Sequence, residues 1–216
     1  MIPRLLCCVL AASLMSSATA QVALLDYLGY GWEDGGLPPS NVGDKLNVVC
    51  IATQADISFG VNLATEEVTL YAYGLTSTGA VPDGFGNSII TYTGGTLELW
   101  RDPGQDADWG VFPANATSPL TFQNGSLLLQ ATFNDFVLIL MPGGAGAYEG
   151  HVDGVAGPLI SGCSDCLYTW GGAFGDATGA QVPDGYDLQI DGVLEVDEAI
   201  PTPNNSFGAV KALFGE

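Results

Sequence analysis

The sequence predicts an all-β protein, built as an antiparallel β-sandwich or jelly roll with a short C-terminal helix or tail. Segments rich in β-branched and aromatic residues recur along the chain, and Gly, Pro, Asn and Asp separate them at short intervals. Only 4 residues are Lys or Arg, whereas 30 are Gly, and this composition disfavours long helices held by Glu–Lys pairs. Strands and turns are therefore expected to make up most of the fold.

Each expected strand shows either alternation or a short apolar run. Between residues 67 and 73, for example, Val68, Leu70 and Ala72 alternate with more polar neighbours, which indicates one buried face. Many short strands at this spacing favour two packed antiparallel sheets. The expected strands are 45–53, 67–73, 88–92, 96–101, 126–133, 136–141, 147–152, 167–170 and 186–196.

Turn residues set the expected connections between these strands. Asn134-Asp135 lies between two apolar runs and predicts a tight hairpin. Thr93-Gly94-Gly95 predicts a turn between the strands on either side of it. Helical signal is confined to a single turn near residues 63–67 and to the tail 206–214.

Residues 1–20 have the pattern of a secretory signal peptide. Arg4 precedes an apolar run from Leu5 to Leu14, and Ala18-Thr19-Ala20 forms a small-residue cleavage site. The apolar run is shorter than the roughly 20 residues that a membrane span requires. We expect an extracellular, cell-surface or periplasmic protein with no integral membrane segment after processing. The expected organisation is a signal peptide at 1–20, a β-sandwich domain at 21–200, and a Pro/Asn linker with a C-terminal tail at 201–216.

The charge balance limits the classes of partner. Asp and Glu number 24, and the formal net charge is −20. Such a surface repels phosphate backbones, so we expect no nucleic-acid partner, and it equally disfavours anionic membrane surfaces. Cations, glycans and other surface proteins remain compatible with it.

Cysteine use leaves the disulfide pairing open. Cys50 lies in an expected strand, and Cys163 and Cys166 flank a short turn. In an oxidising compartment Cys163 and Cys166 form the local pair, whereas Cys50 bonded to either of them would join distant segments. A redox reading of the pair would need a helix that starts at the first cysteine, and the sequence shows none.

An acidic segment is the candidate metal site. Asp102, Asp106 and Asp108 lie close together before Trp109, and calcium prefers six to eight oxygen ligands supplied by such flexible acidic loops. The alternative is that these aspartates only cap solvated turns. Trp109, next to the acidic segment, is the candidate ligand-binding residue, because an aromatic ring beside carboxylates suits a glycan.

No catalytic motif is present in the sequence. It contains no nucleophile elbow, phosphate loop or dinucleotide fingerprint, which favours a non-enzymatic role and leaves a glycan-active enzyme as the alternative. Glu149, His151 and Asp153 alternate and would share one face of a strand, where they form either an acid–base group or an ordinary polar face. Because His151 is the only histidine, a multi-histidine metal site is excluded.

Four segments carry a resemblance to known proteins: residues 30–36 (YGWEDGG), 121–129 (TFQNGSLLL), 168–174 (YTWGGAF) and 186–192 (YDLQIDG). They resemble uncharacterised exported all-β proteins of environmental bacteria, and this resemblance implies no activity. The tail 206–216 is similar to terminal sorting or attachment motifs, or else it is a helical end that packs on the domain.

These observations lead to two functional expectations. The first is a secreted or cell-surface, non-enzymatic β-sandwich with a structural, adhesion or matrix role and calcium stabilisation. The second is a carbohydrate-binding module or a glycan-active enzyme on a jelly-roll fold.

Overall fold

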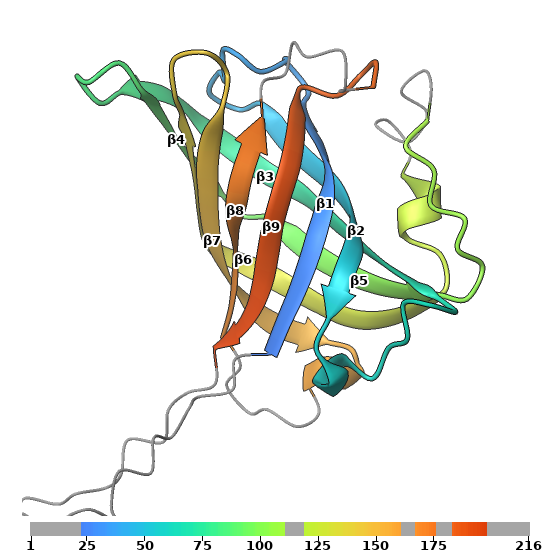
Figure 1. The fold of residues 1–216 in the computed structure, drawn as a ribbon. Helices are drawn as coiled ribbons and strands as arrows, with labels where there is room; N and C mark the ends of the chain where they lie inside the picture. Colours follow the sequence, from blue (N-terminus) through green and yellow to red (C-terminus); the bar gives the residue numbers. More distant parts are fainter. Residues whose placement is uncertain (1–22, 111–118, 161–166, 176–182, 198–216) are drawn as a thin grey trace, which may run out of the picture. The chain divides into compact units, whose positions relative to one another are not determined.

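The computed structural model describes residues 23–110, 119–160, 167–175 and 183–197 (Figure 1). Their strands are β1 (Ala23–Glu33), β2 (Lys45–Ala55), β3 (Glu67–Pro82), β4 (Ser88–Thr93), β5 (Thr96–Asp102), β6 (Ser126–Leu140), β7 (Gly146–Ala156), β8 (Leu167–Gly175) and β9 (Leu188–Asp197). Three short 3₁₀ turns accompany them: η1 (Ile57–Phe59), η2 (Leu120–Phe122) and η3 (Pro158–Ile160). The expectation of an all-β protein is confirmed.

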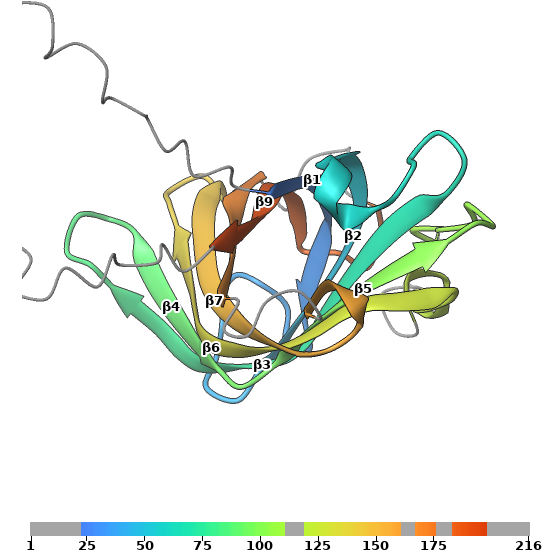
Figure 2. The same cartoon turned by 90° about the horizontal axis from the view of Figure 1, so that it is seen from below.

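The strands form a closed, eight-stranded antiparallel barrel in place of the expected sandwich or jelly roll (Figure 2). Apart from β4 and β5, strands that follow one another in the chain pair with one another, and β9 returns to pair with β1, which closes the sheet. β4 and β5 lie end to end between β3 and β6, so together they fill a single position in the wall. The expectation of two packed sheets was wrong because alternation reports a buried face without reporting whether the sheet closes on itself.

A bend crosses three adjacent strands at one level of the wall. Gly74 of β3 has a φ of 76°, Gly95 between β4 and β5 has a φ of 103°, and the register of β6 shifts between Phe133 and Asp135. The amide of Phe133 donates to the carbonyl of Gly95 with an N···O distance of 3.2 Å, which joins two parts of this bend. Bulges and glycine kinks of this kind curve a sheet toward closure.

Two expected turns are therefore corrected. Asn134-Asp135 is a bulge within the continuous strand β6. Gly94-Gly95 is a kink between β4 and β5, which lie end to end. Asn134 and Asp135 are exposed, whereas the flanking Phe133 and Phe136 are both buried. The extra residue keeps both rings inside the barrel, and this break in alternation has the same appearance in sequence as a turn.

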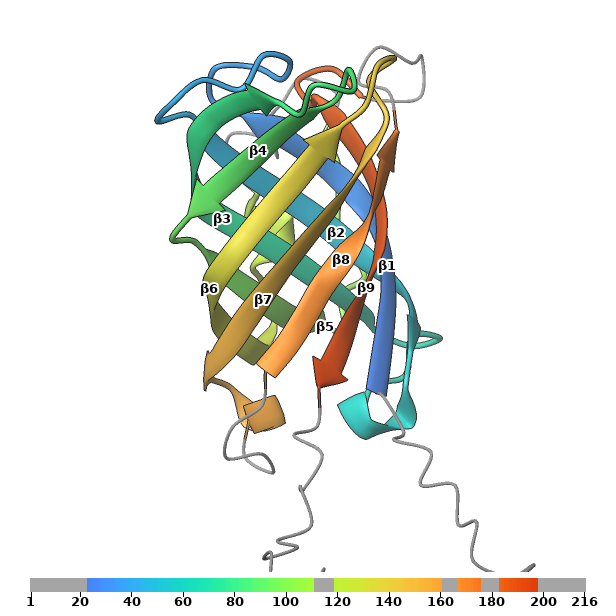
Figure 3. The same ribbon diagram turned by 90° about the vertical axis from the view of Figure 1, so that its left-hand side faces the viewer.

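Inward-facing side chains fill the barrel with aromatic and aliphatic groups. The ring of Trp170 lies among those of Tyr27, Phe133, Phe136 and Tyr148, with centroid separations of 5.4–6.0 Å. Such contacts add about 0.5–1.5 kcal/mol per pair beyond the burial of apolar area. The strands run diagonally across the wall, so each contributes to several levels of this interior (Figure 3).

The segment between β5 and β6, called the excursion below, is described at residues 103–110 and 119–125, and these parts pack against the outer wall of the barrel. It contains η2, whose Phe122 is fully buried on the outside of the barrel together with Val49 and Tyr186. The hydroxyl of Thr69 on β3 donates to the carbonyl of Phe122 at 3.0 Å. This second apolar cluster fixes the acidic residues that follow β5 relative to the barrel wall.

Strands β1 to β9 lie within the expected domain 21–200, whereas the expected signal peptide and the C-terminal tail lie outside the described residues. Among the residues that the structure describes, no helix is long and apolar enough to cross a membrane.

Candidate metal centre

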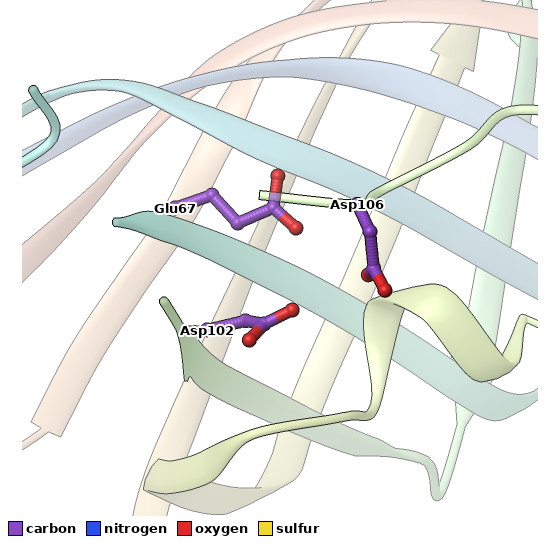
Figure 4. A group of neighbouring side chains, drawn as sticks. All are labelled: Glu67, Asp102 and Asp106. Carbon is purple, nitrogen blue, oxygen red and sulfur yellow. The ribbon is translucent and has the colours of Figure 1, made fainter. Parts of the chain in front are cut away.

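Three carboxylates meet where β3 begins and β5 ends. One carboxylate oxygen from each of Glu67, Asp102 and Asp106 lies within 4.8 Å of the others (Figure 4). Glu67 and Asp102 are direct cross-strand partners in the β3–β5 pair, and Asp106 is brought to them by the excursion. Like charges placed opposite each other on neighbouring strands destabilise a sheet unless something compensates them.

Backbone and amide groups satisfy part of this cluster. The amide of Ala107 donates to Oε1 of Glu67 at 2.9 Å, and that of Gly104 donates to Oδ1 of Asp102 at 2.8 Å. Nδ2 of Asn124 donates to Oδ1 of Asp106 at 2.7 Å. These neutral donors orient the carboxylates but do not neutralise them.

Burial, and after it the acidic neighbours, raise the pKa of Glu67. Burial raises this pKa, backbone hydrogen bonds from Ala107 and Asp106 lower it, and the charges of Asp102 and Asp106 raise it again, so that it lies above its ordinary value. The nearby guanidinium of Arg101 forms an ion pair with Glu66. Arg101 and Asp102 are successive residues of β5 and point to opposite faces of it, so the guanidinium of Arg101 points away from the cluster.

A neutral oxygen adjoins the carboxylates. Oδ1 of Asn124 is buried and has no hydrogen-bond partner among the described residues, although Nδ2 of the same amide contacts Asp106. Calcium uses amide and carboxylate oxygens together, with water completing six to eight ligands. The carboxylate and amide oxygens of this cluster are therefore ligands of the kind that calcium prefers.

The structure brings two of the three sequence-predicted metal residues together and separates the third. Asp102 and Asp106 belong to the cluster, whereas the exposed Asp108 accepts a hydrogen bond from the amide of Gly110 at 3.0 Å and caps a turn. Sequence reasoning missed Glu67. The only signal for it is the pairing register, which places it opposite Asp102.

Trp109 occupies the apolar cluster on the outer wall. Its ring lies 4.9 Å from that of Tyr30 and 5.0 Å from that of Phe122, and its carbonyl accepts a hydrogen bond from the hydroxyl of Tyr186 at 2.7 Å. These contacts join the excursion to β1 and to the segment before β9. The position of Trp109 therefore gives it a part in holding the excursion on the wall.

The remaining sequence candidates do not converge on one site. Cys50 is buried inside the barrel and has no disulfide partner among the described residues, and its burial raises the pKa of its thiol well above the ordinary value. Cys163 and Cys166 lie outside the described residues. Nδ1 of His151 lies 2.8 Å from Oδ1 of Asp135 on the outer face of the barrel.

A second polar arrangement on the outer wall was not foreseen. Glu98 on β5 is buried and accepts four side-chain hydrogen bonds at 2.9–3.1 Å, and the strand register supplies the donors on β3 and β6. The donors are Tyr73, Trp100, Gln123 and Gln130. Burial raises the pKa of Glu98, but these hydrogen bonds together lower it below the ordinary value, so the group is a stable carboxylate.

No protein-family model, no curated protein and no solved structure matches this chain.

Proposed function

We propose that this protein is an exported, non-enzymatic barrel with a structural or adhesion role, and that calcium stabilises it at Glu67, Asp102 and Asp106. The observation that supports this proposal is the convergence of three carboxylates from β3, β5 and the excursion within 4.8 Å. A divalent cation would turn their mutual repulsion into attraction. The signal-peptide pattern and the absence of a catalytic motif in the sequence support the exported, non-enzymatic part.

The physical effect of the ion would be to fasten the excursion to the barrel. Glu67 and Asp102 stand on neighbouring strands, whereas Asp106 belongs to the segment that leaves the wall after β5. A ligand that binds only the folded state raises its stability by RT ln(1 + [L]/Kd), about 2.7 kcal/mol at one hundred times Kd. Calcium would thus strengthen the outer wall that a surface protein presents to its partners.

The test is thermal unfolding of residues 21–216, first with EDTA and then with millimolar calcium. We expect calcium to raise Tm, and we expect Asp102→Asn and Asp106→Asn to remove most of that rise. Asp108→Asn is the matched control, because Asp108 lies in the same segment but outside the cluster. An unchanged Tm with calcium, or an equal loss in the Asp108 variant, would reject the site.

A second candidate function, glycan binding, is favoured by the arrangement around Glu98. The rings of Tyr71 and Tyr73 stack on the outer face of β3, with centroids 4.7 Å apart and planes inclined by 24°. Glu98 accepts hydrogen bonds from Tyr73 and Trp100, which holds both side chains in place. Ordered aromatic faces beside fixed polar groups suit a hydroxyl-rich ligand.

The ligand expected at this wall is uncharged. Burial, then the neighbouring Tyr73 and Glu98, raise the pKa of Tyr71 to about 12, so its phenol stays neutral at physiological pH. The net charge of −20 repels anionic sugars. Calorimetric titration with neutral oligosaccharides tests the idea: Tyr71→Ala should weaken binding by roughly tenfold or more, as loss of one stacked ring would, whereas Ile89→Ala on β4 should not. Equal affinities for both variants would reject this wall as the binding face.

A further inference from the structure

A polar network lies at the end of the barrel where loop 34–44 joins β1 to β2. Glu33, the last residue of β1, is only 4 % exposed. Its Oε1 accepts hydrogen bonds from Ser40 at 2.7 Å and from Tyr92 at 2.6 Å. The hydroxyl of Ser40 also lies 2.6 Å from that of Ser77 on β3. The network therefore joins the loop to β1, β3 and β4.

The second oxygen of Glu33 is the anomaly in this network. Oε2 is buried and has no hydrogen-bond partner among the described residues. Two acidic groups raise the pKa of Glu33 further, Asp44 from the loop and Asp187 from the segment before β9. Oδ2 of Asp187 accepts a hydrogen bond from the backbone amide of Glu33 at 2.8 Å. A buried carboxylate in such surroundings is costly, and groups of this kind normally become neutral by holding a proton.

We propose that Glu33 is a buried proton-binding site, whose carboxyl group is protonated while loop 34–44 is seated on the barrel and whose ionisation loosens that loop. This inference does not depend on calcium or glycan binding, because neither site includes the residues of this network.

The loop is positioned to respond to the state of Glu33. Its Leu37 belongs to the interior core, and its Ser40 contacts Glu33 directly. Backbone hydrogen bonds also tie the loop to β3: the amide of Ala80 donates to the carbonyl of Ser40 at 3.2 Å, and the amide of Gly43 donates to that of Ser77 at 2.9 Å. A charge on Glu33 would draw water toward the network and so compete with these contacts.

The shift in the pKa of Glu33 agrees with this geometry and determines the direction in which stability changes with pH. Burial raises the pKa, hydrogen bonds from Tyr92 and Ser40 lower it, and Asp44 and Asp187 raise it, so the folded value lies above the ordinary one. A raised pKa gives stability that is fully present below the ordinary glutamate pKa. That stability is lost as pH rises through the folded value.

The first experiment compares Tm of the mature protein with that of Glu33→Gln at pH 5 and pH 8. The amide keeps an acceptor for Ser40 and Tyr92 but cannot ionise. We expect Tm of the variant to exceed that of the wild type by roughly 2–10 °C at pH 8 and the gap to shrink at pH 5, as removal of a buried charge in a domain of this size predicts. Glu149→Gln, on the exposed face of β7, is the control, and its Tm should stay near that of the wild type at both pH values.

Hydrogen exchange of the amides in loop 34–44 gives the second readout. Because wild type and variant are compared at the same pH, the intrinsic exchange rates cancel. At pH 8 the loop of the wild type should exchange severalfold faster than that of Glu33→Gln, while exchange in β7 and β8 stays equal. Equal exchange of the loop at pH 8 would overturn the coupling between Glu33 and the loop.

Two further results would overturn the proton site itself. A variant less stable than the wild type at pH 8 would mean that the ionised carboxylate is stabilising. The second result is a wild-type Tm that is higher in sodium or potassium chloride than in choline chloride of equal ionic strength. If Glu33→Gln lacks this rise, Oε2 of Glu33 binds a metal cation and not a proton. Should the variant fail to fold, titration of the Glu33 side-chain carboxyl carbon by NMR in the wild type decides the matter: a midpoint at or below the ordinary glutamate value rejects the proposal.

Discussion

The phenol oxygens of Tyr27 and Tyr148 lie 2.7 Å apart inside the barrel, although 121 positions separate the two residues in sequence. Tyr27 belongs to β1 and Tyr148 to β7, strands that are not neighbours in the wall. The hydroxyl of Tyr27 also lies 3.4 Å from the carbonyl of Gly171. Burial raises the pKa of both phenols well above the ordinary value, so both stay neutral and can exchange the roles of donor and acceptor.

The two tyrosines should differ in how much each hydroxyl stabilises the fold. Tyr27→Phe leaves the hydroxyl of Tyr148 buried and without its partner, and should cost about 1–3 kcal/mol. Tyr148→Phe should cost less, because the hydroxyl of Tyr27 can still donate to Gly171. Urea unfolding of both single variants and the double variant measures the coupling between them. Additive losses would show that the two hydroxyls act independently.

The same region of the interior requires a glycine at position 192. A Cβ placed there would lie 2.3 Å from the hydroxyl of Tyr148, 2.5 Å from the carbonyl of Gly171 and 2.6 Å from the hydroxyl of Tyr27. Gly192→Ala should therefore destabilise the barrel by several kcal/mol, about the upper range for overpacking a core. Gly175→Ala is the matched control, since no atom lies within 4 Å of a Cβ at that position of β8.

Chemical denaturation of both glycine variants gives the comparison. The combination of Gly192→Ala with Tyr148→Phe should recover only part of the loss, because the backbone carbonyl of Gly171 still opposes the new methyl group. Full recovery of stability would mean that the new methyl group clashes only with the hydroxyl of Tyr148 and not with the backbone.

Most of the strands could be predicted because their signal is local. The alternation in β3 and the apolar run in β6 mark buried faces wherever the strands pair. β1 was missed because Gly29 and Gly31 interrupt its apolar pattern. Position 29 has no room for a side chain, because a Cβ on Gly29 would lie 2.1 Å from the carbonyl of Val49 on the neighbouring strand. Closure of the barrel through β1 and β9 has no local signal at all.

The candidate site was predictable only to the same extent. Asp102 and Asp106 were found because acidic residues near glycine indicate a metal-binding loop, but Glu67 joins them through the cross-strand register of β3 and β5. Glu33 was also missed, since a single glutamate after Trp32 has no pattern around it. Its significance comes from Ser40 and Tyr92, which only the fold brings to it.

Tyr186 should control how firmly the excursion is held on the outer wall. Tyr186→Phe keeps the ring contacts with Tyr30 and Trp32 but removes the hydrogen bond to the carbonyl of Trp109. We expect a loss of about 0.5–1.5 kcal/mol in stability, together with faster proteolysis between β5 and β6 than in the wild type. Unchanged proteolysis in this segment would show that ring packing alone fixes the excursion.

Glu98 should give the barrel a stabilising contribution that acid removes. Its pKa is lowered, so the stability that it supplies is present above the ordinary glutamate pKa and is lost as pH falls through the folded value. In Glu98→Gln an amide nitrogen replaces one acceptor and faces two of the four donors, whichever way the amide is turned. The loss at pH 7 should be about 1–3 kcal/mol, as expected for buried donors left unpaired.

The pH dependence separates this carboxylate from an ordinary surface glutamate. The gap in unfolding free energy between wild type and Glu98→Gln should narrow as pH falls from 7 to 3, because protonation of Glu98 also weakens it as an acceptor for Tyr73 and Trp100. Glu149→Gln, on the exposed outer face of β7, should leave the acid transition unchanged. Guanidinium unfolding at several pH values measures both gaps. A gap for Glu98→Gln that stays constant across this range would mean that packing of the side chain, and not its charge, supplies the stability.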